Sequence, residues 1–190
     1  MVIVLCGMCG TGKDTIRKEL IKRGCKSLIS YTSRPMREGE EDGKDYWFIS
    51  KEEIEKMKNN NELMDYREYK VYNGDIWGYG HYNYSDINIF NCGVPRIVIA
   101  DLKGAKIFKN KFGDKCIIVY ITSNYKERLD RVLSRGDNKS EIKRRFKQDS
   151  IDFSNDKLYN VVDYIIKNKN GELNKTVNQI MRWVDENEYS

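Results

Sequence analysis

The hydrophobic positions of this 190-residue chain gather in five short runs, each followed by a turn or by a helical pattern. Such runs, rich in β-branched residues, are typical of parallel strands that are buried on both faces of a sheet. The pattern therefore predicts an α/β fold whose core is a five-stranded parallel sheet flanked by helices. The runs are Val2–Leu5, Lys26–Ser30, Ile97–Ala100, Ile117–Ile121 and Tyr164–Ile166.

Apolar residues at helical spacing fill most of the segments between these runs. The clearest stripe begins at Leu173 and Val177, and a stripe of this kind is typical of a helix that packs on a core. Ser50 and Glu53 form a capping box before another helix, and Ser123 is expected to cap a third. The expected helices are Lys13–Arg23, Gly104–Lys111, Asn124–Arg135, Ser140–Ile151 and Glu172–Asn187, with one more after Ser50.

Two segments interrupt this order of strands and helices. Residues 31–92 carry most of the aromatic residues and a polar loop, so we expect an insertion between the second and third parallel strands. Residues 126–151 contain a dense group of arginines between two helical patterns. The core of a single domain is expected to comprise residues 1–30, 93–125 and 152–190, because 190 residues suit one domain.

Composition and charge exclude several classes of protein. Hydrophobic residues make up 39% of the chain and aromatic residues 12%, which argues against a disordered protein. No apolar run approaches the roughly 20 residues of a membrane helix, and Met1–Cys6 lacks the basic residues of a signal peptide. A net charge of +5 is too small to indicate nucleic acid, and the five cysteines favour a reduced, cytoplasmic compartment.

A glycine-rich loop follows the first apolar run and opens the first helical pattern. It fits GxxxxGK, the pattern of phosphate-binding loops, in the strand–loop–helix context that this motif requires. Glycines let successive backbone N–H groups converge on phosphate oxygens, and Lys13 is expected to reach the β- and γ-phosphates of ATP. The expected ATP-binding residues are Gly7, Met8, Cys9, Gly10, Thr11, Gly12, Lys13, Asp14 and Thr15.

Asp14 departs from this pattern, because the residue after the lysine is normally a serine or threonine whose hydroxyl holds Mg²⁺. We favour a role for Asp14 in the magnesium shell, directly or through water; the alternative is an acidic residue that stabilises the first helical turn. Cys6 and Cys9 form a CxxC pair across the loop, but the glycines and Lys13 explain this stretch better than a redox function does.

Arg34, Arg37 and Tyr46 lie close together in the polar loop of residues 31–92. Guanidinium groups bind phosphate oxygens bidentately and a phenol adds a further donor, so these residues form a candidate anion clamp. From these residues alone, a solvated charged loop is an equally good explanation.

The stretch from Ser30 to Phe48 resembles the signature of the guanylate kinase family, Ser-x-x-Thr-Arg-x-x-Arg-x-Gly-Glu-x-x-Gly-x-Asp-Tyr-x-Phe. Ser33 and Pro35 differ from it, since the family prefers threonine before the first arginine and proline just before the second. The resemblance continues more weakly along nearly the whole chain. The residues that match the signature are Ser30, Arg34, Arg37, Gly39, Glu40, Gly43, Asp45, Tyr46 and Phe48.

The resemblance implies how the phosphate of the acceptor nucleotide is held. In the family, two arginines and a tyrosine of the signature bind the GMP phosphate, and a second tyrosine belongs to a later Tyr-Gly-Ser/Thr element. Residues 79–81 are the favoured match to this element, with His81 in the hydroxyl position, and residues 77–79 are the alternative. The implied phosphate-binding residues are therefore Arg34, Arg37, Tyr46 and Tyr79.

Guanine recognition is implied for a different set of residues. Ser30 and Asp65 match base contacts of the family, with Glu68 as the alternative to Asp65. Carboxylates and a hydroxyl complement the N1–H and N2–H₂ donors of guanine, a pair that adenine lacks. Asp101 follows the third apolar run, at the strand end where ligands of parallel sheets bind.

His81, the only histidine, is not expected to transfer protons, because phosphoryl transfer depends on positioning and charge.

Asp101 is also implied, with Asp14, in the magnesium site. The family motif resembles Asp-x-Asp-x-x-Gly, and here Ile99 replaces the first aspartate while Asp101 and Gly104 remain. The loss of one carboxylate and the gain of Asp14 lead us to expect a rearranged magnesium shell.

The arginine-rich segment 126–151 resembles the lid of the family, whose arginines close over the transferring phosphoryl group. Arg131, Arg135 and Arg145 match by position; in an ordinary helix they would be surface charges. Asn168 stands where the family has an adenine contact, and a turn residue is the equally weighted alternative.

The expected protein is thus a P-loop kinase with an acceptor-binding insertion and an arginine-rich lid, using ATP and Mg²⁺ to phosphorylate GMP or dGMP. No nucleic acid or membrane partner is expected, and the sequence does not indicate an oligomeric state. One alternative is a kinase for another nucleoside monophosphate or a phosphorylated metabolite. A binding module without chemistry is a second, and RNA binding through the arginines is the weakest.

Overall fold

The computed structural model describes residues 1–85, 89–90, 93–154, 158 and 160–188 of the chain. Contacts within the chain divide it into two units. Met1–Ser27 and Gly93–Ser190 form the first, which we call the core unit, and Leu28–Cys92 form the second, which we call the insertion unit.

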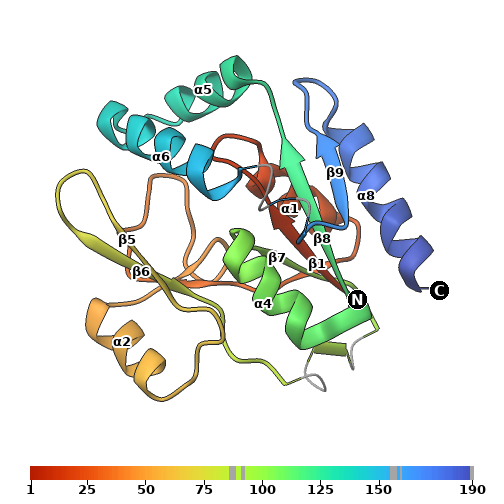
Figure 1. Ribbon diagram of the computed structural model, residues 1–190, viewed down its shortest axis with the longest axis horizontal. Helices are drawn as coiled ribbons and strands as arrows, with labels where there is room; N and C mark the ends of the chain where they lie inside the picture. Colours follow the sequence, from red (N-terminus) through yellow and green to blue (C-terminus); the bar gives the residue numbers. More distant parts are fainter. Residues whose placement is uncertain (86–88, 91–92, 155–157, 159, 189–190) are drawn as a thin grey trace. The chain divides into compact units, whose positions relative to one another are not determined.

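A five-stranded parallel sheet forms the centre of the core unit (Figure 1). The strands lie in the order β2-β7-β1-β8-β9, so the predicted fold class is confirmed. The second strand is shorter than expected, because it ends at Ser27. The strands are β1 (Val2–Cys6), β2 (Lys26–Ser27), β7 (Arg96–Ile99), β8 (Cys116–Thr122) and β9 (Tyr164–Lys167).

The strand β9 differs from the prediction that every strand is buried on both faces. Its residues alternate between half-buried and exposed, and Ile165 is 50% exposed. The reason is its position, since β9 pairs only with β8 at the edge of the sheet among the described strands. By contrast, all five residues of β1, in the middle of the sheet, are buried.

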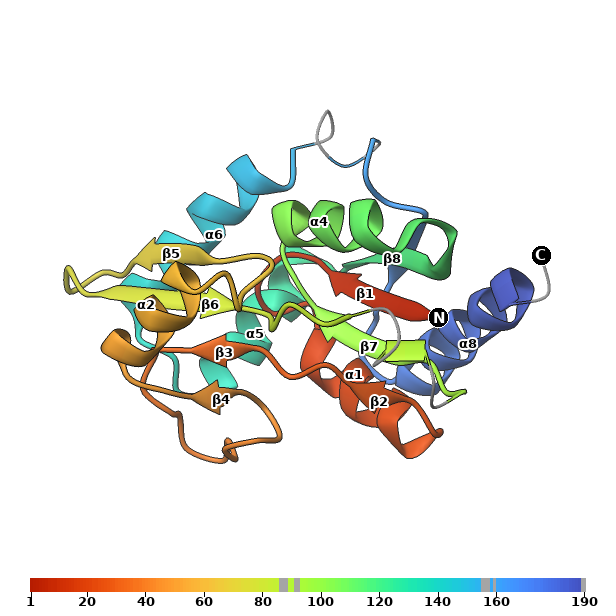
Figure 2. The same ribbon diagram turned by 90° about the horizontal axis from the view of Figure 1, so that it is seen from below.

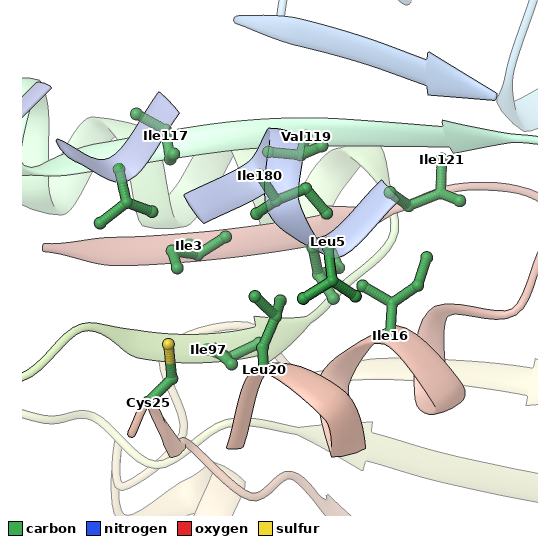
Figure 3. Packing of buried hydrophobic residues seen from close by; sticks show 12 residues of the cluster. Ile3, Leu5, Ile16, Leu20, Cys25, Ile97, Ile117, Val119, Ile121 and Ile180 are labelled. Atoms are coloured by element: carbon green, nitrogen blue, oxygen red, sulfur yellow. The ribbon is translucent and has the colours of Figure 1, made fainter. Parts of the chain in front are cut away.

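Helices cover both faces of this sheet (Figure 2). On one face, α1 (Lys13–Lys22) and α8 (Leu173–Glu188) pack against alternate residues of the central strands. Figure 3 shows Ile16, Leu20 and Ile180 from these helices meeting side chains of β1, β7 and β8. On the other face lies α4 (Leu102–Phe112), which a short 3₁₀ helix (Gly113–Lys115) connects to β8.

Two helices, α5 (Tyr125–Ser134) and α6 (Lys139–Asp152), follow β8 and contain the arginine-rich segment. The expected cap of α5 was wrong by one residue: Asn124 is the N-cap, and Glu127 accepts a hydrogen bond from its backbone N–H at 3.2 Å. Ser123 lies just after β8, where its hydroxyl is 2.7 Å from the carbonyl oxygen of Asn168. That position leaves the extended residue Asn124 to begin the helix.

The insertion unit contains a four-stranded sheet in the order β4-β3-β6-β5. Its strands are β3 (Tyr31–Thr32), β4 (Trp47–Phe48), β5 (Arg67–Lys70) and β6 (Ile76–Gly80). The helix α2 (Lys51–Asn59) has the predicted capping box, since Ser50 and Glu53 each accept a hydrogen bond from the backbone N–H of the other. Across the described residues of both units, no helix has the length and apolar content needed to span a membrane.

Candidate active site

The phosphate loop connects β1 to α1, as the sequence predicts. Lys13 Nζ donates to the carbonyl oxygens of Gly7 at 2.6 Å and Met8 at 3.0 Å, so its ammonium group lies over the loop. Gly10 has a φ of +79°, and a Cβ added there would lie 2.5 Å from the carbonyl oxygen of Arg128. Only glycine satisfies both the left-handed backbone and this close approach.

Two predicted site residues, Asn168 and the lid arginine Arg131, hold the loop from outside. Asn168, which is buried after β9, donates from Nδ2 to the carbonyl oxygen of Thr11 at 2.8 Å. Arg131 donates from Nη1 to the carbonyl oxygen of Gly10 at 3.1 Å and from Nη2 to that of Asn168 at 3.2 Å. Both side chains therefore bind carbonyl groups, which fixes the shape of the loop around its N–H groups.

Arg128 and Asp149 also lie against the loop, and neither was predicted from the sequence as a site residue. Asp149 Oδ2 accepts a hydrogen bond from the backbone N–H of Cys9 at 2.7 Å and another from Arg128 Nη2 at 2.7 Å. The position of Arg128 three residues before Arg131 on α5 is the only sequence signal for this contact. Nothing near Asp149 in the sequence indicates it, because Asp149 is 140 residues from Cys9.

The other two predicted lid arginines have local acidic partners. Arg135 ends α5 and pairs with Asp137 at 3.1 Å, with 45% of its side chain exposed. Arg145 on α6 pairs with Glu141 at 2.8 Å, and Arg144 pairs with the same carboxylate at 2.7 Å. Burial alone would raise the pKa of Glu141, but hydrogen bonds from the two arginines outweigh it and hold that pKa at about 2.

The two predicted magnesium residues lie at the N-terminal ends of two helices of the core unit. Asp14 is in the first turn of α1, with 57% of its side chain exposed and its carboxylate 3.9 Å from Arg17 Nε. Asp101 follows β7 and caps α4, where its Oδ1 accepts a hydrogen bond from the N–H of Gly104 at 2.8 Å. Ile99 packs against the core instead of offering a ligand.

Two carboxylates such as Asp14 and Asp101 would suit Mg²⁺ only together with the phosphates of a bound nucleotide. The described part of the chain contains no group of three or more acidic, histidine or cysteine side chains that could hold a metal ion. Mg²⁺ in kinases is usually bound by one or two carboxylates together with the phosphates of the nucleotide, and it keeps several waters. Asp14 and Asp101 supply that number of carboxylates.

The cysteine pair of the loop lacks the features of a redox site. Both Cys6 and Cys9 are free thiols. Cys6 is completely buried at the end of β1, and burial raises its pKa to about 12. A thiol with such a pKa is protonated at neutral pH and is a poor nucleophile, which agrees with the preference for a phosphate loop.

In the insertion unit, Glu40 and Tyr46 surround Arg34, the first arginine of the predicted anion clamp. Its guanidinium makes two parallel hydrogen bonds, both 2.9 Å, to the carboxylate oxygens of Glu40, and it lies 5.2 Å from the ring centroid of Tyr46. The backbone N–H of Arg37 donates to Glu40 at 2.8 Å. Burial would raise the pKa of Glu40, but these hydrogen bonds hold it below its usual range.

The predicted tyrosines of the clamp lie together. Tyr79 on β6 is opposite Thr32 of β3, and its ring is 6.2 Å from that of Tyr46. Trp77, the tyrosine position in the alternative register, is instead opposite Tyr69 on β5. The register with residues 79–81 thus brings two tyrosines to Arg34, and we retain it.

Ser30, His81 and Asp65 form a line of hydrogen bonds in the insertion unit. Ser30 Oγ lies 2.7 Å from His81 Nε2, and His81 Nδ1 lies 2.8 Å from Asp65 Oδ2. His81 and Asp65 are both buried, and Arg67 also donates to Asp65 Oδ2 at 2.8 Å. The alternative Glu68 is 47% exposed and accepts a hydrogen bond from Tyr66. The sequence missed the role of His81 as the link between Ser30 and Asp65.

Comparison with known proteins shows the family of the chain. Residues 1–187 match the model of the family described as guanylate kinase. The chain is 29% identical over 177 residues to a guanylate kinase of Anaplasma phagocytophilum strain HZ, covering 90% of this chain and 80% of the relative. It is 31% identical over 172 residues to a guanylate kinase of Clostridioides difficile strain 630, covering 89% and 80%.

A solved structure shows the same fold. The crystal structure of guanylate kinase from Anaplasma phagocytophilum superimposes with a TM-score of 0.72 and covers 98% of this chain and 85% of that chain. The sequence identity in this superposition is 22%, so this likeness concerns the fold.

Proposed function

Because the chain belongs to the guanylate kinase family, it is a nucleoside monophosphate kinase, and we propose that it transfers the γ-phosphoryl group of ATP to GMP or dGMP. The observation that supports this proposal is that Lys13 lies over the phosphate loop, while Glu40 holds the guanidinium of the buried Arg34 beside Tyr46. We interpret these two places as separate anion sites. A kinase of this class must bind two nucleotides through their phosphates.

The free thiols of the described cysteines favour the cytoplasm as the place of the reaction.

For the donor nucleotide, we assign the loop N–H groups and Lys13 to the β- and γ-phosphates of ATP. Asp14 and Asp101 would hold Mg²⁺, which neutralises charge on the phosphates when it is bound. Arg135 and Arg145 would turn from their carboxylate partners toward the transferring phosphoryl group. Cations placed there stabilise the charge that spreads over its oxygens in the transition state.

For the acceptor nucleotide, we assign the phosphate to Arg34, Arg37, Tyr46 and Tyr79. The two hydrogen bonds that Arg34 donates to Glu40 fix the plane of the guanidinium before any ligand arrives. A pre-oriented guanidinium loses little conformational entropy when it binds a phosphate.

For the base, Ser30, Asp65 and Asp101 are the residues we assign to guanine. One observation favours a second candidate, a kinase for another nucleoside monophosphate. The oxygens of Asp65 already accept hydrogen bonds from His81 and Arg67, so this carboxylate has less capacity for the donors of guanine than an exposed one. GMP remains the first candidate because the family model that matches residues 1–187 is that of guanylate kinase.

A coupled assay of ADP release tests the proposal. Purified protein with Mg-ATP is given GMP, dGMP, AMP, CMP, UMP and dTMP in turn, and kcat/KM is measured for each. We expect GMP or dGMP to be preferred, loss of turnover in Lys13→Ala and a steep fall in Arg37→Ala. Arg182→Ala, which changes an exposed arginine on α8, is the matched control and should leave turnover unchanged.

The other outcomes separate the alternatives. Turnover with a different nucleoside monophosphate alone would select the second candidate. Saturable binding of ATP and GMP without turnover would select a binding module and overturn the proposed reaction.

A further inference from the structure

Asp149 lies against the phosphate loop, where a phosphate group would bind. Its Oδ2 accepts a hydrogen bond from the N–H of Cys9 at 2.7 Å, and Cys9 is the third residue of the glycine-rich loop. Backbone N–H groups of such loops are the groups that bind phosphate oxygens. A carboxylate and a phosphate oxygen are both anions, and one N–H group cannot donate a full hydrogen bond to both.

Arg128 fixes Asp149 in this position. Its Nη2 donates to Asp149 Oδ2 at 2.7 Å, while its Nε donates to the carbonyl oxygen of Cys9 at 2.8 Å. Its guanidinium carbon lies 4.5 Å from the ring centroid of Phe146, which is on α6 with Asp149. With 9% of the Arg128 side chain and 15% of the Asp149 side chain exposed, the pair is largely shielded from water.

The charges around Asp149 determine how strongly its carboxylate would repel a nucleotide phosphate. Arg128 compensates one negative charge, and the ammonium group of Lys13 lies over the same loop. Burial raises the pKa of Asp149, so its environment disfavours the carboxylate despite these cations. A polyphosphate that enters the loop adds further negative charge, which makes the carboxylate form less favourable still.

We propose that Asp149 is an internal competitor for the phosphate loop, held there by Arg128, and that a nucleotide phosphate must displace its carboxylate from the N–H of Cys9. This inference rests on the proposed role of the loop as the nucleotide site. Asp149 is four residues after Arg145, so the two side chains lie one turn apart on the same face of α6. Displacement of Asp149 therefore couples occupation of the loop to the position of the helix that carries Arg145.

The test compares Asp149→Asn with Asp152→Asn. Both substitutions remove one negative charge from α6, but the described contact of Asp152 is with Gln148 rather than with the loop. ADP binding is measured by isothermal titration calorimetry at fixed salt and neutral pH, with the thermal midpoint of each variant as a check on folding. We expect Asp149→Asn to bind ADP about 5- to 10-fold more tightly and Asp152→Asn to bind it like the natural protein.

Arg128→Met provides a second measurement that does not depend on a stable Asp149→Asn protein. Removing Arg128 leaves the Asp149 charge without its cation, so ADP binding should weaken by about 10-fold or more. Adding Asp149→Asn to this variant should restore most of the affinity. A merely structural role of the pair predicts the opposite, namely that the double variant is the weakest.

Unchanged or weaker ADP binding in Asp149→Asn, without rescue in the double variant, would overturn the inference. ADP binding requires neither an acceptor nor turnover. Absence of turnover with intact ADP binding would therefore overturn the proposed reaction while leaving this inference in place.

Discussion

In the insertion unit, Arg34 is paired with Glu40, six residues further along the chain, whereas in the core unit the N–H of Cys9 is paired with Asp149, 140 residues further along. Most of the clamp around Arg34 comes from the loop between β3 and β4, and Tyr79 joins it from β6. The phosphate loop takes its shape from contacts with α5, α6 and the turn after β9, through Arg128, Asp149 and Asn168. The proposed acceptor site is therefore mostly local in sequence, whereas the proposed nucleotide site depends on tertiary packing.

This difference determines how each site should respond to mutation. A local clamp should fail only when one of its own residues changes. The phosphate loop should also fail when residues far away in the sequence change, because they supply its partners.

The largest effect is expected from breaking the local clamp directly with Arg34→Ala. This variant removes the bidentate donor and leaves the half-buried carboxylate of Glu40 without its main partner. We expect kcat/KM for the acceptor to fall by about 10³-fold, with little change in the KM for ATP. Steady-state kinetics with each substrate varied in turn checks this.

Glu40→Gln is the control for that prediction. The amide retains an oxygen that accepts from Arg34 but loses the charge, so the acceptor kcat/KM should fall less than in Arg34→Ala. If Arg34→Ala raised the KM for ATP as much as the KM for the acceptor, the separation of the two sites would be contradicted.

A smaller effect is expected from a matched pair of glycine substitutions, Gly10→Ala and Gly39→Ala. Both glycines have nearly the same φ, +79° and +78°. A Cβ at Gly10 would lie 2.5 Å from the backbone of Arg128, whereas nothing lies within 4 Å of one at Gly39. We expect Gly10→Ala to weaken ADP binding by about 10²-fold. Gly39→Ala should cost only about 1–2 kcal/mol of left-handed strain in unfolding free energy.

Calorimetric titration with ADP and urea unfolding measure the two quantities. Similar losses of ADP binding in both variants would show that the phosphate loop has no special dependence on the packing of α5.

The smallest effect is expected in the pH dependence of stability. Glu141 has a folded pKa of about 2, against 4.5 for an ordinary glutamate, so it binds protons less readily in the folded state. Its contribution is therefore complete above about pH 4.5 and is lost as the pH falls toward about 2. Allowing for solvent screening, we expect this contribution to be on the order of 1–2 kcal/mol.

Urea unfolding of the natural protein and of Glu141→Gln at pH 6 and pH 3 checks this prediction. The natural protein should lose more unfolding free energy between the two pH values than the variant does. Parallel losses would mean that the ion pairs of Glu141 with Arg144 and Arg145 contribute nothing to the acid side of the stability curve.

The same contrast explains how much could be predicted from the sequence. The parallel strands were predictable because short buried runs of β-branched residues rarely form any other structure. The capping box of Ser50 and Glu53 was predictable because its two partners are three residues apart. The clamp around Arg34 was visible for the same reason, since Glu40 lies in the same signature. Prediction failed at Ser123, where a strand end shifts the helix cap by one residue.

Long-range contacts were beyond sequence reasoning. Arg128 and Asp149 are ordinary charged residues of two helices until the fold brings both to the phosphate loop. In the sequence, His81 only matched the Ser/Thr position of the Tyr-Gly-Ser/Thr element. The pairing of β3 with β6 is what brings it between Ser30 and Asp65. Their partners are far apart in the chain, so no spacing rule contains them.

Phosphorus-31 NMR of the products distinguishes transfer to GMP from hydrolysis of ATP, because it identifies where the phosphoryl group of ATP goes. The protein is incubated with Mg-ATP and GMP, and the spectra are followed with time. We expect ADP and GDP to appear in equal amounts, without inorganic phosphate. Formation of ADP with inorganic phosphate, or no reaction with GMP, would contradict it.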